Sequence, residues 1–110
     1  MIPRLKAGIF VRALIRRAQV AGASAYVARH GAEEAGVLIL KLSPPGGAPT
    51  VLTQARRGEG ELVWVKPLGD APDEEKVAAW CEKQIRIDPD VWIVDIEDRE
   101  GRVFVDEPVV

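Results

Sequence analysis

Carboxylates gather near the C-terminal end of the chain in a pattern that could hold a metal ion. Asp95 and Glu97 stand two positions apart in the apolar run that begins at Trp92, so a strand there would direct both side chains to one face. Hard cations such as Mg²⁺ prefer carboxylate oxygens, and a metal held in this way can activate attack on a phosphodiester. One hypothesis is therefore a divalent-metal enzyme acting on phosphodiesters, with Lys41 or Lys66 assisting. Further carboxylates nearby are Asp88, Asp90 and Asp98.

The same residues have a plainer interpretation as structural and solvated groups. Alternating acids are common on the exposed face of a strand, and Asp88-Pro89-Asp90 stands where a helix must end. His30 is the only histidine, and we expect it to lie exposed in a turn. Cys81 falls on the apolar side of a predicted helix, which favours a buried and inert thiol. The sequence therefore indicates no catalytic set and implies no cofactor.

A basic, amphipathic segment at the other end of the chain predicts a binding surface. Residues 5–21 have the periodicity of a helix, with Arg12, Arg16 and Arg17 opposite its apolar stripe. Three apolar residues interrupt that polar face: Ile9, Ala13 and Val20. The helix is therefore apolar over more of its circumference than one core contact needs, and a second copy of the chain is the simplest partner to cover the rest.

Nucleic-acid binding is a third and weaker hypothesis. Arg56 and Arg57 fall in a predicted turn, and Trp64 on the following strand would stack a base if it were exposed. An exposed Trp64 would equally mark a protein-binding surface. The formal net charge is −2, so nothing global attracts the chain to RNA or to an anionic membrane.

The length of the chain and its predicted helices and strands indicate a single α+β domain over 1–110, which must position these residues. The chain has 110 residues, of which 47% are hydrophobic and 29% charged, enough for one core but not for two. We expect an N-terminal helix, a four-stranded antiparallel meander, a second helix and a C-terminal β-hairpin that joins or covers the sheet. The predicted ranges are a helix at 5–21, strands at 25–30, 37–42, 50–55 and 61–66, a helix from the candidate N-cap Asp70 to about Arg86, and a hairpin with strands at 92–97 and 102–105 around the turn Asp98–Gly101.

The composition favours a cytoplasmic location. A single cysteine, Cys81, excludes an internal disulfide and fits a reducing compartment. No apolar run approaches the roughly 18 residues of a membrane span. Arginines at 12, 16 and 17 also interrupt what would otherwise be the apolar core of a signal peptide.

The segment over residues 84–102 carries a family resemblance. It reads QIRIDPDVWIVDIEDREGR, and together with Leu5-Lys6 and Arg16-Arg17 it resembles a small bacterial family known as domain of unknown function 1491. The family has no assigned activity, cofactor or catalytic residue, so the resemblance implies a fold and no chemistry.

These observations favour a non-catalytic module that binds protein partners, with a homodimer as the first expectation. The metal-dependent enzyme and the weak RNA binder are the alternatives.

Overall fold

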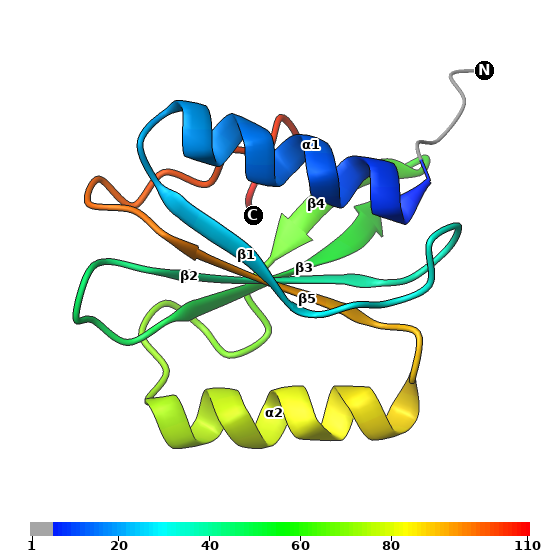
Figure 1. The fold of residues 1–110 in the computed structure, drawn as a ribbon. Helices are drawn as coiled ribbons and strands as arrows, with labels where there is room; N and C mark the ends of the chain where they lie inside the picture. The colour runs from blue at the N-terminus through cyan, green and yellow to red at the C-terminus, as the bar shows by residue number, and fades with distance from the viewer. Residues whose placement is uncertain (1–5) are drawn as a thin grey trace.

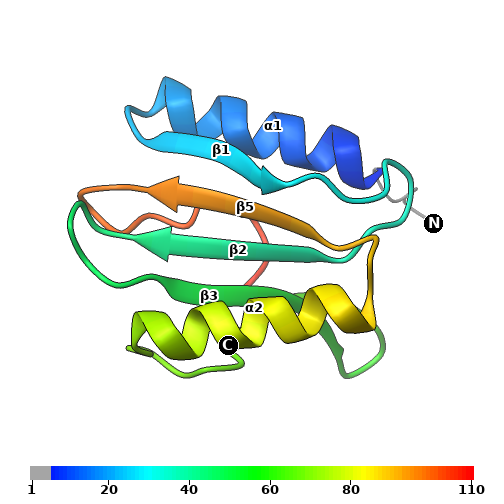
Figure 2. The same cartoon turned by 60° about the horizontal axis from the view of Figure 1, so that its bottom comes forward.

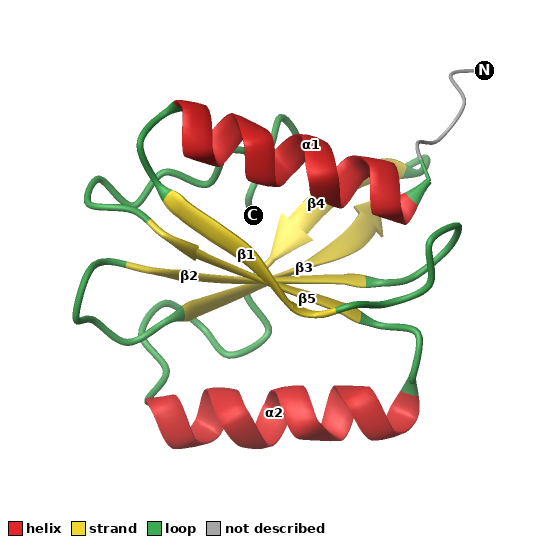
Figure 3. Ribbon diagram, viewed as in Figure 1, coloured by secondary structure: helices red, strands yellow, loops and turns green. Residues whose placement is uncertain are grey.

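Two helices enclose a five-stranded sheet in three layers (Figure 1, Figure 3). The computed structural model describes residues 6–110. Helix α1 lies on one face of the sheet and α2 on the other, which gives an α+β fold. The elements in chain order are α1 (Ala7–Val20), β1 (Ser24–Arg29), β2 (Leu38–Ser43), β3 (Thr50–Arg57), β4 (Glu61–Val65), α2 (Glu74–Ile87) and β5 (Trp92–Glu97).

The sheet is mixed, which corrects the predicted antiparallel meander of four strands. Its order is β1-β5-β2-β3-β4, so β5 separates β1 from β2 and runs parallel to β2. The pairs β2–β3 and β3–β4 are antiparallel as predicted. The physical reason is that the first half of β5 is buried on both faces: Trp92, Val94 and Ile96 pack in the core under α1, and Ile93 packs in the core under α2. A strand covered on both faces belongs in the middle of a sheet.

The predicted C-terminal hairpin is also wrong, although its turn is present. Gly101 has a φ of 68°, and its N–H donates to Asp98 O at 3.2 Å, as a tight turn requires. No strand follows it, because both edges of β5 are already occupied by β1 and β2. The chain instead crosses the sheet and reaches β4, where Val109 forms a parallel bridge with Trp64.

Both helices form close to the predicted ranges. The predicted start of α1 at Leu5 lies outside the described residues, and Gly22 ends the helix with a φ of 94°. The N-cap of α2 is Asp73, whose carboxylate accepts Lys76 N at 2.8 Å, rather than the predicted Asp70. Among residues 6–110, no helix is long and apolar enough to cross a membrane.

The two helices leave part of the sheet without a helical cover. Figure 2 shows α2 in front of β3, while β1 and β5 have no helix in front of them. The core under α2 accordingly joins Val77 and Cys81 to Ile39, Val51 and Ile93. The part of that face formed by β1 and the end of β5 therefore stays open to solvent.

Candidate functional site

The predicted metal pair lies on the α2-side face, where Asp95 is partly buried and Glu97 is exposed. Asp95 and Glu97 share this face, as the alternation predicts. Asp95 is already engaged, however, because the Tyr26 hydroxyl donates to Asp95 Oδ2 at 2.8 Å and Lys41 Nζ lies 3.7 Å from Asp95 Oδ1. The hydrogen bond to this carboxylate raises the pKa of Tyr26 above its usual value of 10.0. Within residues 6–110, no three His, Cys, Asp or Glu side chains are grouped so that they could hold a metal ion.

The other predicted carboxylates fix backbone turns. Asp88 Oδ1 accepts Asp90 N at 3.0 Å, directly after the end of α2. Asp98 is 5% exposed, and its carboxylate accepts Arg102 N at 2.8 Å, Arg102 Nε at 3.0 Å and Arg102 Nη2 at 2.8 Å. These bonds from Arg102 lower the pKa of Asp98 to about 2. Because Arg102 Nη2 also donates to Ala21 O at 3.0 Å, this pair ties the β5 turn to the end of α1.

The three arginines of the predicted basic surface on α1 differ in their interactions. Arg12 forms an ion pair with Glu33 at 3.1 Å, in the loop after β1. Arg17 donates to Phe104 O and to Asp106 Oδ1, both at 2.7 Å, and so holds the C-terminal segment. Arg16 is exposed and makes no hydrogen bond or ion pair within residues 6–110. The arginines are therefore exposed as predicted, but two of them act within the chain.

Trp64 is not a surface residue, which corrects its predicted role in binding. Its side chain is fully buried in the core under α1, and Nε1 donates to Glu107 Oε1 at 3.0 Å. It cannot stack a nucleic-acid base without unfolding this region, so the RNA hypothesis loses its aromatic platform. The neighbouring arginines are also engaged, since Arg56 donates to Gly60 O at 2.7 Å and Arg57 pairs with Glu61 at 2.5 Å.

His30 and Cys81 lie as predicted. His30 is exposed, and its ring lies against that of Trp92 with centroids 4.2 Å apart. Cys81 is buried, and this burial raises the pKa of its thiol, which makes it less reactive.

One feature that sequence patterns did not indicate is the difference between the two edges of the sheet. At the β4 edge, Trp64 N donates to Pro108 O and Val110 N donates to Trp64 O, both at 2.8 Å. The C-terminal segment therefore closes this edge at Trp64. At the β1 edge, no strand or segment of residues 6–110 pairs with β1 on the side away from β5. An open edge presents unpaired backbone groups that can pair with another chain.

Hydrogen bonds in the centre of the sheet show which backbone groups of β1 face this open edge. Trp92 N donates to Val37 O and Asp98 N donates to Ser43 O, so the even-numbered residues of β5 face β2 and the odd-numbered ones face β1. The partners of those odd residues in β1 are Ser24, opposite Glu97, and Tyr26, opposite Asp95.

It follows that Ala25 and Val27 direct their N–H and C=O groups outward. Only one of these groups has a partner within residues 6–110: Ala25 O accepts Gln19 Nε2 at 3.3 Å.

The side chains of this edge are uncharged, and all but that of Ala25 are exposed. Tyr26 is 59% exposed and Val27 is 36% exposed. No residue from Ser24 to Ala28 carries a charge, whereas proteins often place lysine on an edge strand to prevent pairing. A bulge between Val27 and Arg29 ends the regular stretch. A partner could therefore pair with β1 over about four residues, from Ser24 to Val27.

Comparisons with other proteins establish the family and no activity. The model of a family described as "Protein of unknown function (DUF1491)" matches residues 5–106. A crystal structure of a DUF1491 family protein from Caulobacter crescentus CB15 is 42% identical, with a TM-score of 0.90, and the match covers 97% of this chain and 100% of that one. An NMR structure of a DUF1491 family protein from the same organism is 44% identical over 96% of each chain, with a TM-score of 0.85.

Protein Atu0922 from A. tumefaciens, a solution structure, is 30% identical with a TM-score of 0.76, over 98% of this chain and 100% of that one. No curated protein matches the chain. The family resemblance seen in residues 84–102 is thus confirmed, and the match extends over residues 5–106 of the chain. The chain belongs to DUF1491, a family of proteins of unknown function.

Proposed function

We propose that this protein is a non-catalytic module that forms a homodimer by pairing the β1 strands of two copies. The observation that carries the proposal is that the edge of β1 is open and uncharged, whereas at the opposite end of the sheet the chain itself pairs with β4 at Trp64. A cytoplasmic location fits the single buried thiol of Cys81.

A two-fold axis restricts how two β1 strands can pair. Residues opposite each other must lie on the same face of a continuous antiparallel sheet, and hydrogen-bonded pairs need outward-facing backbone groups from both chains. Ala25 opposite Val27 of the second copy satisfies both conditions. The two-fold axis then also places Val27 opposite Ala25 of the second copy. This register would form four main-chain hydrogen bonds, at the expense of the 3.3 Å bond from Gln19 to Ala25 O.

The same register would bury the exposed apolar side chains of the edge. Tyr26 would stand opposite Tyr26 of the second copy in a non-hydrogen-bonded pair, the type in which side chains come closest. Both rings would lie on the face that α2 leaves open. Because only about four residues pair, we expect a weak dimer whose population depends on protein concentration.

Sedimentation velocity from micromolar to millimolar protein tests this proposal. Val27→Pro removes an N–H that faces outward, so the monomer keeps its hydrogen bonds to β5 while the dimer loses two of its four. Tyr26→Lys places two like charges across the axis. Ile87→Lys is the matched control, because it adds the same charge at an exposed apolar residue on α2.

We expect dimer for the wild type and for Ile87→Lys, and monomer for the two β1 variants, all with unchanged far-UV circular dichroism. A wild-type protein that stays monomeric at millimolar concentration, or β1 variants that dimerise like the control, would refute the pairing.

A further inference from the structure

A pocket on the opposite face of the sheet from α2 is independent of the β1 edge. It has a volume of about 390 Å³ and lies between the ends of β2, β3 and β5 and the C-terminal segment. This volume falls in the range of about 300–1,000 Å³ that is typical of small-molecule sites. No residue of α1 lines the pocket, which lies where the C-terminal segment covers the sheet instead.

The middle of the pocket is aliphatic. Leu52 and Ile96 are fully buried in the sheet, and Leu42 is half-buried beside them. Val103 and Val109 of the C-terminal segment also line the pocket, together with the polar side chains of Ser43 and Thr50. The aliphatic middle favours a hydrocarbon body over a polar ligand.

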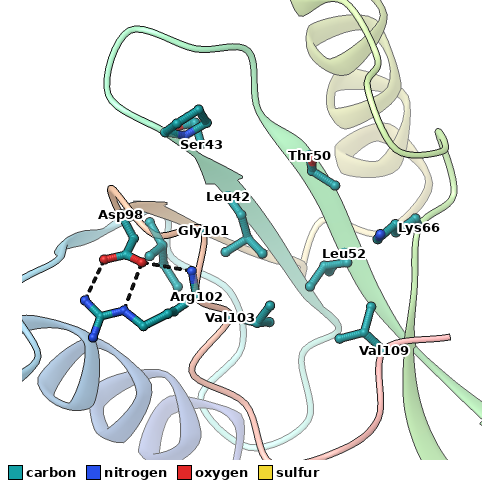
Figure 4. Close-up of a pocket in the computed structure, with 12 residues that line it drawn as sticks. Leu42, Ser43, Thr50, Leu52, Lys66, Asp98, Gly101, Arg102, Val103 and Val109 are labelled. Atoms are coloured by element: carbon teal, nitrogen blue, oxygen red, sulfur yellow. Dashed lines mark hydrogen bonds and ion pairs between the residues drawn. The ribbon is translucent and has the colours of Figure 1, made fainter.

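The charged groups stand at opposite ends of this aliphatic stretch. Figure 4 shows the Asp98–Arg102 pair at one end and Lys66 at the other, with Leu42, Leu52 and Val103 between them. Asp98 receives three hydrogen bonds from Arg102, so each neutralises the other. The partner of Lys66 is Asp70 at 2.7 Å, whose side chain is 87% exposed. An exposed ion pair of this kind is weak, so Lys66 is the charge that a ligand can recruit.

We infer that this pocket binds a small monocarboxylate with an unbranched aliphatic body. The carboxylate would replace Asp70 as the partner of Lys66, and the chain would lie along Leu42 and Leu52 toward Val103. The carboxylate rather than an ammonium group is favoured because Asp98 is already neutralised, which leaves Lys66 as the one lining charge with only a surface partner among residues 6–110.

Titration of the ¹⁵N-labelled full chain with hexanoate, octanoate, 1-octanol and octylammonium tests the inference. We expect saturable amide shifts at Leu42, Ser43 and Val103 with the carboxylates. Affinity should rise about three- to fourfold for each added CH₂, as apolar burial predicts. Octanol should bind more weakly than octanoate, and octylammonium more weakly still.

Two charge variants and one pocket variant sharpen the test. Lys66→Met should weaken octanoate binding by up to about fivefold while leaving octanol unchanged. Lys83→Met removes the same charge from an exposed position on α2 and should change neither. Val103→Phe should fill the pocket and abolish both.

Equal affinities for octanoate and octanol, equal effects of Lys66→Met and Lys83→Met, or shifts that do not saturate would each overturn the inference. Because Lys66→Met changes a partly exposed side chain, it keeps the test valid even if Val103→Phe impairs folding.

Discussion

Replacing Trp92 by phenylalanine should be far more damaging than the same change at Trp80. Trp92 is fully buried in β5, and its Nε1 donates to Ala32 O at 2.7 Å. The loop above it approaches closely, since a Cβ built on Gly31 would lie 2.5 Å from Trp92 Cδ1. Trp80 is half-buried on α2, and its Nε1 makes no hydrogen bond within residues 6–110. The two substitutions remove the same atoms from different surroundings.

The magnitude follows from two losses at Trp92. Phenylalanine leaves the Ala32 carbonyl without its donor, and because Ala32 is only half-buried this costs about 1 kcal/mol, the lower end of the range for a buried group. The missing ring atoms, roughly two CH₂ equivalents, remove about 1.5 kcal/mol of apolar burial. We therefore expect Trp92→Phe to lower the free energy of unfolding by about 2.5 kcal/mol, and Trp80→Phe by about 1 kcal/mol or less.

Urea denaturation followed by far-UV circular dichroism measures this difference without relying on tryptophan fluorescence. The slope m should match the wild type in both variants, so that midpoints report stability alone. If the two substitutions destabilise the protein equally, the contact of Trp92 with the loop over residues 31–36 contributes no special stability.

Two further predictions concern ionisation. Tyr26 is the only tyrosine, so the alkaline absorbance change at 295 nm reports it alone, and we expect a midpoint above 10 that Asp95→Ala returns toward 10.0; an unchanged midpoint in the variant would contradict the hydrogen bond. The pKa of Asp98 falls from 3.8 to about 2 on folding, so its charged form stabilises the protein above about pH 4 and this contribution is lost as the pH falls through about 2. The difference in Tm between wild type and Asp98→Asn should thus be constant above about pH 4.5 and shrink below pH 4, and a constant difference down to pH 2 would disprove it.

Local sequence patterns predicted both helices and five strands, but they also predicted a strand at 102–105 that does not form, and they did not predict the strand order. The alternation at Trp92–Glu97 identified β5, and the turn at Gly101 was visible in the residues themselves. Strand order depends on which segments meet from distant parts of the chain, and β2 and β5 are separated by two strands and a helix. The one available signal was that β5 is apolar on both faces at Ile93, which is typical of a central strand.

The candidate site was predictable to a similar degree. The shared face of Asp95 and Glu97 follows from a period of two, and the exposure of Arg16 follows from helical periodicity. The burial of Trp64 could not be foreseen, because the cover comes from Glu107 and the C-terminal segment. The open edge of β1 likewise becomes apparent only once β5 is known to occupy its other side.

The central place of β5 has a consequence for how the protein is made. During synthesis, α1 with β1 and the β2–β3–β4 unit emerge as two parts with no strand between them, because the strand that joins them is translated last. Until residues 92–97 leave the ribosome, β1 has two free edges and β2 has one. Such long-range strand pairing is slow and exposes edges to wrong partners. The final step of folding should therefore be the insertion of β5, which joins the two parts.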